Sequence, residues 1–240
     1  MLRPYPGGRE SAGAKLSATE PFTLALPDRL FYDRRMIRQA VASDAVKAVP
    51  LIVQAIGHIA FVLTGTTDSQ EVASILSDFF GQEDNRISYQ NALVMEEEGE
   101  LVGVAIFYDG AKARELDVPL ERAASEKSGD SNYSIPTEPE ASEFYLDTLS
   151  VSPRCQGKGY GRKLIEAGCD RARNLGHHRI ALLIEVEMRR PNRCTSDWGF
   201  ARTTPSGSRD RNTSTWYGVC DIPRRPGTRF EAGIISRCRP

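Results

Sequence analysis

The sequence predicts an α/β fold, and three observations carry this prediction. Segments with strand character alternate with helical segments along residues 36–187. An apolar, β-branched run over residues 144–151 leads through a glycine-rich turn into a helical pattern. At 240 residues, the chain is long enough to bury a sizeable core, in one large domain or two small ones.

The first elements follow a leader. Residues 1–35 are rich in Gly, Pro, Ser and Arg without a sustained period, and we expect them to be flexible. Met36 to Val41 alternates as a short strand does. A helix from Ala45 to Ile59 follows, because apolar residues recur on one face and Ser43-Asp44 can cap it. Asp68-Ser69 caps a second helix that runs through Phe80.

The next elements begin with a hairpin. Residues 91–97 and 101–108 are predicted strands, joined by a turn that contains Gly99, and the acidic triplet Glu96-Glu97-Glu98 is expected to be a solvated hairpin end. A helical pattern and a long loop come next. The remaining predicted elements are the helix 112–127, the loop 128–141, the strand 144–151, the helix 158–174 and the strand 179–187, with Gly176 as the left-handed residue after the last helix.

The turn between residues 151 and 164 carries the strongest chemical signal. The strand pattern ends at Pro153, and the turn passes through Gly157, Gly159 and Gly161 before a helix begins. The start of a helix presents unpaired backbone N–H groups at the positive end of its dipole. Glycine lets this backbone approach ligand oxygens, because it has no Cβ. The turn therefore predicts a phosphate or diphosphate site.

Three types of phosphate-binding loop share glycines with this turn, and only one of their patterns is met in full. A nucleoside-triphosphate loop requires Ser or Thr after its lysine, but Gly159 follows Lys158. A dinucleotide fingerprint requires a third glycine where Arg162 stands. The pattern V-x-P-x-x-Q/R-G-x-G-x-G/A-x-x-L is met at Val151, Pro153, Gln156, Gly157, Gly159, Gly161 and Leu164. In this pattern the chain resembles the acyl-coenzyme A pyrophosphate loop of the GNAT superfamily of N-acetyltransferases.

The resemblance implies a fold and a domain organisation. The order of predicted elements from Met36 to Glu187 is similar to the GNAT core. We therefore expect a three-layer fold, in which helices flank a mixed central sheet, with irregular N- and C-terminal extensions. The acetyltransferase domain is expected at residues 36–200, after the leader 1–35, and residues 201–240 are expected to be divergent or partly disordered.

The resemblance also implies acetyl transfer from acetyl-coenzyme A to a primary amine of a small molecule or a protein, within a ternary complex. Backbone N–H groups from Gln156 through Gly157, Lys158, Gly159 and Tyr160 to Gly161 are expected to bind the diphosphate. Leu149 and Val151 would pair with the pantetheine arm as with an added strand. Arg154 and Lys158 would add charged contacts to phosphates. A coenzyme A-binding sensor or scaffold without turnover is the alternative.

Two carboxylates are candidates for the base that deprotonates the amine. Glu143 precedes the strand 144–151 and aligns with the glutamate that protein-acetylating GNAT members use. Asp147 lies on the same strand, with the same side-chain parity, and is the second candidate.

The resemblance weakens after residue 187. GNAT members usually have an Asn and an Ala after this strand, but Met188 and Pro191 stand at those positions in this chain. Thr195 stands where the family has a Tyr that acts as general acid. Residues 188–240 contain 11 arginines, no lysine and only 4 acids. Either this region has diverged or the reading frame is altered. Tyr145, Tyr160 and Tyr217 are candidates to replace the missing Tyr.

Composition limits the partners. Residues 36–187 carry 24 acidic and 14 basic side chains, which argues against nucleic-acid binding and favours an amine substrate. The five cysteines form no C-x-x-C pair, so we expect no metal site and reduced thiols in a cytoplasmic protein. The longest apolar stretch, Val49 to Leu63, is interrupted and too short to cross a membrane. Homodimers are common in the family that the chain resembles.

Overall fold

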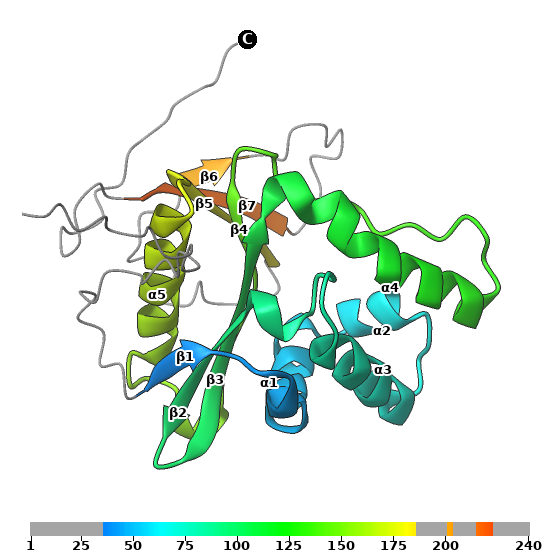
Figure 1. The fold of residues 1–240 in the computed structure, drawn as a ribbon, viewed down its shortest axis with the longest axis horizontal. Helices are drawn as coiled ribbons and strands as arrows, with labels where there is room; N and C mark the ends of the chain where they lie inside the picture. The colour runs from blue at the N-terminus through cyan, green and yellow to red at the C-terminus, as the bar shows by residue number, and fades with distance from the viewer. Residues whose placement is uncertain (1–35, 186–200, 204–214, 223–240) are drawn as a thin grey trace, which may run out of the picture. The chain divides into compact units, whose positions relative to one another are not determined.

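A computed structural model describes residues 36–185, 201–203 and 215–222. The expected leader, residues 1–35, lies outside the described residues, as do the positions of Met188, Pro191 and Thr195. The described part is built on one seven-stranded sheet with the order β1-β2-β3-β4-β5-β7-β6 (Figure 1).

The sheet is mixed. Every neighbouring pair of strands is antiparallel except β4 and β5, which are parallel. The strands are β1 Ile37–Gln39, β2 Ala92–Glu97, β3 Glu100–Asp109, β4 Phe144–Val151, β5 Arg179–Glu185, β6 Ala201–Thr203 and β7 Thr215–Asp221.

Helices cover both faces of the sheet, so the fold has three layers. Helix α5 lies on one face, and α1 to α4 lie on the other (Figure 1). The helices are α1 Ala45–Ile56, α2 Ile59–Thr64, α3 Ser69–Gly81, α4 Ala113–Ser128 and α5 Tyr160–Asn174. The prediction of a three-layer α/β fold with a mixed central sheet is confirmed.

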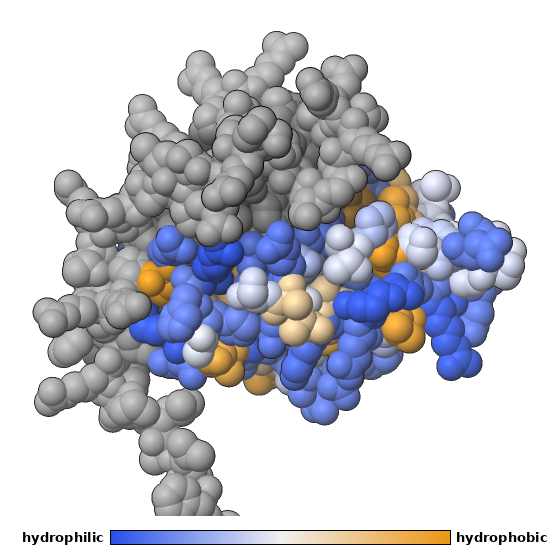
Figure 2. Space-filling model, turned by 90° about the horizontal axis from the view of Figure 1, so that it is seen from above, coloured by the Kyte–Doolittle hydropathy of each residue, from blue (hydrophilic) through white to orange (hydrophobic). Residues whose placement is uncertain are grey.

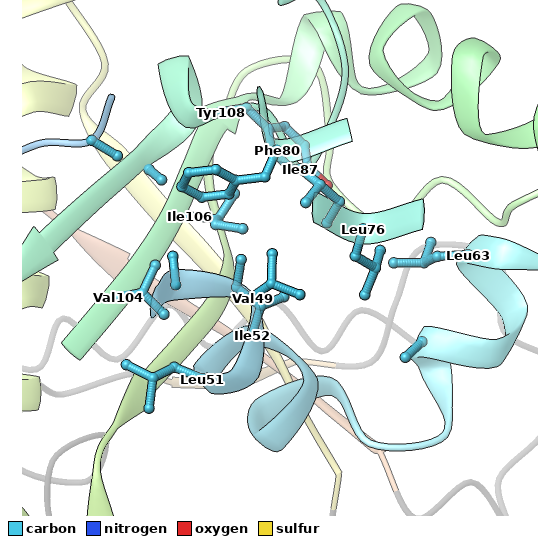
Figure 3. Packing of buried hydrophobic residues seen from close by; sticks show 14 of the residues in the cluster. Val49, Leu51, Ile52, Leu63, Leu76, Phe80, Ile87, Val104, Ile106 and Tyr108 are labelled. Carbon is cyan, nitrogen blue, oxygen red and sulfur yellow. The ribbon is translucent and has the colours of Figure 1, made fainter. Parts of the chain in front are cut away.

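The larger core lies between the sheet and helices α1 to α4 (Figure 3). Val49 and Ile52 come from one face of α1, and Leu76 and Phe80 from one face of α3, at the spacing that helical periodicity requires. All four are at most 1% exposed. Burial of each such side chain contributes roughly 1.5–3 kcal/mol to the stability of the fold. These apolar faces therefore hold α1 and α3 against the sheet.

The second core lies under α5. Leu164 and Ile165 are fully buried against the sheet, where the rings of Phe107 and Phe144 stack with centroids 5.9 Å apart. Gly168 of α5 lies over Phe107 so closely that an added Cβ would stand 2.1 Å from its ring. This contact lets the middle of α5 approach the sheet closely.

Local turn chemistry decided several elements. Asp68 caps α3 by accepting from the N–H groups of Gln70 and Glu71, as predicted. Glu98 and Gly99 both have positive φ, so a two-residue turn closes the predicted hairpin. The predicted helix 45–59 was too long, because α1 ends at Gly57, where φ is +52°, and α2 follows as a separate short helix.

The C-terminal region contributes strands that the sequence did not predict. Strand β7 pairs with β5 along Thr215–Asp221, and β6 pairs with β7. The residues of β7 include aromatic and β-branched types, which favour a strand despite the many arginines around it.

On the face that Figure 2 shows, the described residues are mainly hydrophilic. Figure 2 shows apolar groups on one face in separate patches rather than in a continuous band. None of the described helices combines the length and apolarity that a membrane span requires.

Candidate functional site

Strands β4 and β5 separate part of the way along the sheet. Only Phe144, Tyr145 and Leu146 of β4 pair with β5, whereas β4 stays paired with β3 as far as Val151. The separation begins at a bulge. Ile106 of β3 faces Thr148 and Phe107 faces Leu146, so no residue of β3 lies opposite Asp147 in the strand register. Among the described residues, no strand pairs with residues 147–151 on the side that β5 leaves.

Backbone groups point into this opening. The N–H of Ser152 donates to the carbonyl of Val102 in β3. Backbone groups of alternate residues in a strand face opposite sides, so the N–H and C=O groups of Leu149 and Val151 point away from β3. The carbonyl of Val151 accepts from two side-chain amides, Gln156 Nε2 at 3.1 Å and Gln54 Nε2 at 3.3 Å. The two residues predicted to pair with pantetheine therefore lie on the open edge.

The glycine turn continues from the end of this edge. Gly157 and Gly159 have φ near +80°, and a Cβ added at either would meet no atom within 4 Å. Helix α5 begins at Tyr160 and has no side-chain cap, in contrast to α3 with its Asp68. The first N–H groups of this 15-residue helix thus have no side-chain cap, and the turn before them has open space beside two glycines, as a diphosphate site requires.

The predicted cofactor residues form one continuous segment of strand, turn and helix. These residues are Leu149, Val151, Arg154, Gln156, Gly157, Lys158, Gly159, Tyr160 and Gly161. Arg154 and Gln156 are exposed beside the turn. The side chains of Lys158 and Tyr160 are already engaged, because both donate to Glu97 at the end of β2.

The expectation of a solvated acidic hairpin end was wrong for two of its three residues. Glu96 accepts from Arg38, and Glu97 accepts from Lys158, Tyr160 and Cys155. The hydrogen bonds from Tyr160, Lys158 and Cys155 lower the pKa of Glu97 to about 2. These contacts arise between segments about sixty residues apart, so local charge patterns could not reveal them.

Glu143 lies before the paired part of β4. Its side chain is 2% exposed, and its Oε2 accepts from the N–H of Glu140 at 3.0 Å. Four residues of strand, roughly 13 Å, separate it from Asp147. The structure therefore does not bring the two predicted base candidates together.

Asp147 lies at the bulge, where β4 and β5 separate. Its Oδ1 accepts from Arg86 Nε at 2.6 Å and from the Tyr108 hydroxyl at 3.1 Å, and its Oδ2 accepts from Thr148 Oγ1 at 2.8 Å. The bulge turns Asp147 and Thr148 towards each other and breaks the simple alternation of the strand.

Arg86 is the centre of a buried charged cluster that sequence reasoning missed. The Arg86 cluster comprises this guanidinium and the carboxylates of Asp117, Glu138 and Asp147, which lie 3.4, 3.4 and 2.6 Å from it. Tyr145 donates to Glu138. Burial raises the pKa of Asp117 to about 6 and raises the pKa of Glu138. Three acids face one cation beside the opening.

Within the ranges that the structure describes, no group of three His, Cys, Asp or Glu side chains is placed to hold a metal ion. The side chains of Cys155 and Cys169 are both buried.

The fold is that of an acetyltransferase. A profile of the acetyltransferase (GNAT) family matches residues 60–194, and the chain belongs to this family. The predictions of GNAT membership and of an acetyltransferase are confirmed. No curated protein sequence matches the chain.

Solved structures share this fold. One is the crystal structure of an acetyltransferase whose sequence is 24% identical to this chain. Its TM-score is 0.61, and the match covers 78% of this chain and 99% of the other. An N-acetyltransferase from Staphylococcus aureus Mu50 is 18% identical, with a TM-score of 0.58, over 78% of this chain and 100% of the other. At these identities, the likeness establishes the fold.

Proposed function

We propose that this chain transfers an acetyl group from acetyl-coenzyme A to a primary amine, of a small molecule or a protein, by direct attack in a ternary complex. The observation that carries this proposal is the open edge of β4, which runs straight into the uncapped glycine turn of α5. A diphosphate and an amide-bearing arm need these two features in this order.

The geometry supports a specific placement of the cofactor. The N–H groups of residues 156–161 would bind the diphosphate, and the space beside Gly157 and Gly159 would take its oxygens. The pantetheine amides would pair with Leu149 and Val151. An amide N–H of the arm would then take over the Val151 carbonyl from Gln54 or Gln156.

This placement brings the thioester to the separation of β4 and β5, next to Asp147. The amine nitrogen attacks the carbonyl carbon, the C–S bond breaks, and the sulfur leaves as a thiolate. A backbone N–H at the opening would stabilise the developing oxyanion. A thiolate with an ordinary pKa of ~8.5 leaves without a dedicated acid.

We propose Asp147 as the base and keep Glu143 as the second candidate. Asp147 lies at the opening. Arg86 and Tyr108 occupy its Oδ1, whereas its Oδ2 accepts from Thr148. The second lone pair of Oδ2 would take the proton that the amine loses. Glu143 lies about four residues further from the opening and is bonded to the backbone of its own turn.

One observation favours a non-catalytic coenzyme A-binding protein as the alternative. The hydroxyls of Tyr145 and Tyr160 both donate to carboxylates, so neither is positioned as a spare acid for the thiolate. Such a protein would bind coenzyme A without turnover.

Calorimetry with coenzyme A, together with thiol release from acetyl-coenzyme A across a panel of amines, separates these functions. Binding with amine-dependent release supports the enzyme, and binding without release supports the alternative. Gly159→Ala places a Cβ in the diphosphate space and should abolish measurable binding. Gly129→Ala is the matched control, because its φ of +74° imposes similar strain at the end of α4. Equal affinity in both variants would contradict the proposed site.

A further inference from the structure

Glu97 connects the β2–β3 hairpin to the glycine turn. Its carboxylate accepts from Cys155 Sγ at 3.2 Å, from Lys158 Nζ at 3.0 Å through both oxygens, and from the Tyr160 hydroxyl. These donors lie at the beginning, middle and end of the turn. One anion therefore fixes the whole turn from outside.

Two of the three donors are buried, which distinguishes this contact from a surface ion pair. Tyr160 is 8% exposed and Cys155 is 3% exposed, so without Glu97 their hydroxyl and thiol would lose their acceptor in a nearly dry place. The pair with Lys158, which is 48% exposed, would by itself contribute little, because solvent screens it.

The protonation states suit this arrangement. The bonds from Tyr160 and Lys158 lower the pKa of Glu97, so it stays ionised at neutral pH. Burial and the neighbouring carboxylate raise the pKa of the Cys155 thiol, and the bond to Glu97 raises the pKa of the Tyr160 hydroxyl. Both therefore keep the protons that they donate.

Tyr160 links this contact to the ligand site. It is the first residue of α5, so its N–H is one of the uncapped donors that would bind the diphosphate. Its ring lies 5.7 Å from the ammonium groups of both Lys158 and Lys163. Fixing this side chain fixes the end of the helix, whereas Gly157 and Gly159 beside it would otherwise leave the turn many conformations.

We propose that Glu97 is a positioning residue for coenzyme A: it holds the turn 155–160 in its binding geometry through Cys155, Lys158 and Tyr160. Lys158 then acts through Glu97 rather than as a direct phosphate ligand. The inference rests on the proposed function, because it concerns the same diphosphate site. Its physical basis is preorganisation, since a turn that is already ordered loses less entropy when the ligand binds.

Calorimetry with coenzyme A and steady-state kinetics with acetyl-coenzyme A on Glu97→Gln test this proposal. We expect the Kd and KM to rise about tenfold, equivalent to about 1.4 kcal/mol, with kcat within twofold of the wild type. Glu98→Gln is the matched control: it removes the same charge from an exposed position of the same hairpin and should leave Kd unchanged. A merely structural role would lower stability or kcat without this selective rise in KM.

A double-variant cycle with Lys158→Met distinguishes positioning from direct phosphate binding. If Lys158 acts through Glu97, the double variant binds no more weakly than Glu97→Gln alone. If Lys158 binds phosphate directly, Glu97→Gln frees it and leaves affinity unchanged or higher, and Lys158→Met weakens binding equally in both backgrounds. That result would overturn the proposal.

The affinity of the wild type for coenzyme A separates the role of Glu97 from the proposed function. No binding of coenzyme A by the wild type overturns both, whereas tight wild-type binding with unchanged affinity in Glu97→Gln overturns only the role of Glu97. If Glu97→Gln melts early, Tyr160→Phe tests the same contact, because it removes only the hydroxyl. It should weaken binding by less than Glu97→Gln, and unchanged affinity would contradict the proposal.

Discussion

Replacing Asp117 by Asn should make the protein more stable at neutral pH. Asp117 is 1% exposed on α4, and the guanidinium that pairs with it, Arg86 Nη1, lies 3.4 Å away and is shared with two other carboxylates within the Arg86 cluster. Burial is the largest influence on this carboxyl group and raises its pKa from 3.8 to about 6, against the opposing effect of Arg86.

The sign and size of the effect follow from proton linkage. Because the folded pKa lies above the unfolded one, the folded state holds more protons between pH 4 and pH 6, and stability is lost as the pH rises through this window. The rise of the pKa from 3.8 to about 6, at about 1.36 kcal/mol for each tenfold change in proton affinity, corresponds to a loss of about 3 kcal/mol in the free energy of unfolding above pH 6. Asn resembles the protonated acid and avoids this loss, although it attracts Arg86 less, so 3 kcal/mol is an upper value.

Urea unfolding of the wild type and Asp117→Asn at several pH values from 4 to 7.5 measures this effect. The difference between the two proteins cancels most contributions of other carboxylates. We expect nearly equal stability at pH 4 and a variant that is up to about 3 kcal/mol more stable at pH 7. A difference that does not change with pH, or a less stable variant at pH 7, would refute the reasoning, because Arg86 would then outweigh burial.

Three further substitutions test the packing and charges around the site. Arg86→Met should cost about 3–5 kcal/mol in urea unfolding at pH 7, because it leaves buried carboxylates unpaired, and less at pH 5; a loss below 1 kcal/mol would contradict the cluster. Gly168→Ala should lower stability by roughly 1–3 kcal/mol, since its Cβ would meet the Phe107 ring, and Phe107→Leu in the same chain should restore part of the loss. Asp68→Ala should cost about 1 kcal/mol in thermal unfolding through the lost α3 cap, and an unchanged melting temperature would show that water replaces it.

The sequence predicted best where local chemistry decides the structure. The bounds of β4 at residues 144–151 and the turn after Pro153 agree with the structure, because a β-branched run, a proline and several glycines leave few alternatives. The cap at Asp68 and the Glu98-Gly99 turn followed from the same kind of local rule.

The misses depend on tertiary contacts. Arg86 lies in a short connection between α3 and β2, and nothing nearby in the sequence pairs with it; its partners come from α4, β4 and the loop before β4. In the sequence, Gln54 is a single polar residue within an apolar helical pattern. Its hydrogen bond to the Val151 carbonyl forms only because the fold brings α1 beside β4. The break at Gly57 was missed because the apolar pattern continues beyond it.

Amide hydrogen exchange with and without coenzyme A tests most directly whether the β4 edge and the glycine turn hold the cofactor. Peptides that cover residues 149–161 should gain strong protection, whereas peptides within α4, residues 113–128, should exchange unchanged. Binding of coenzyme A without protection over 149–161, or with protection centred elsewhere in the chain, would contradict this assignment of the site.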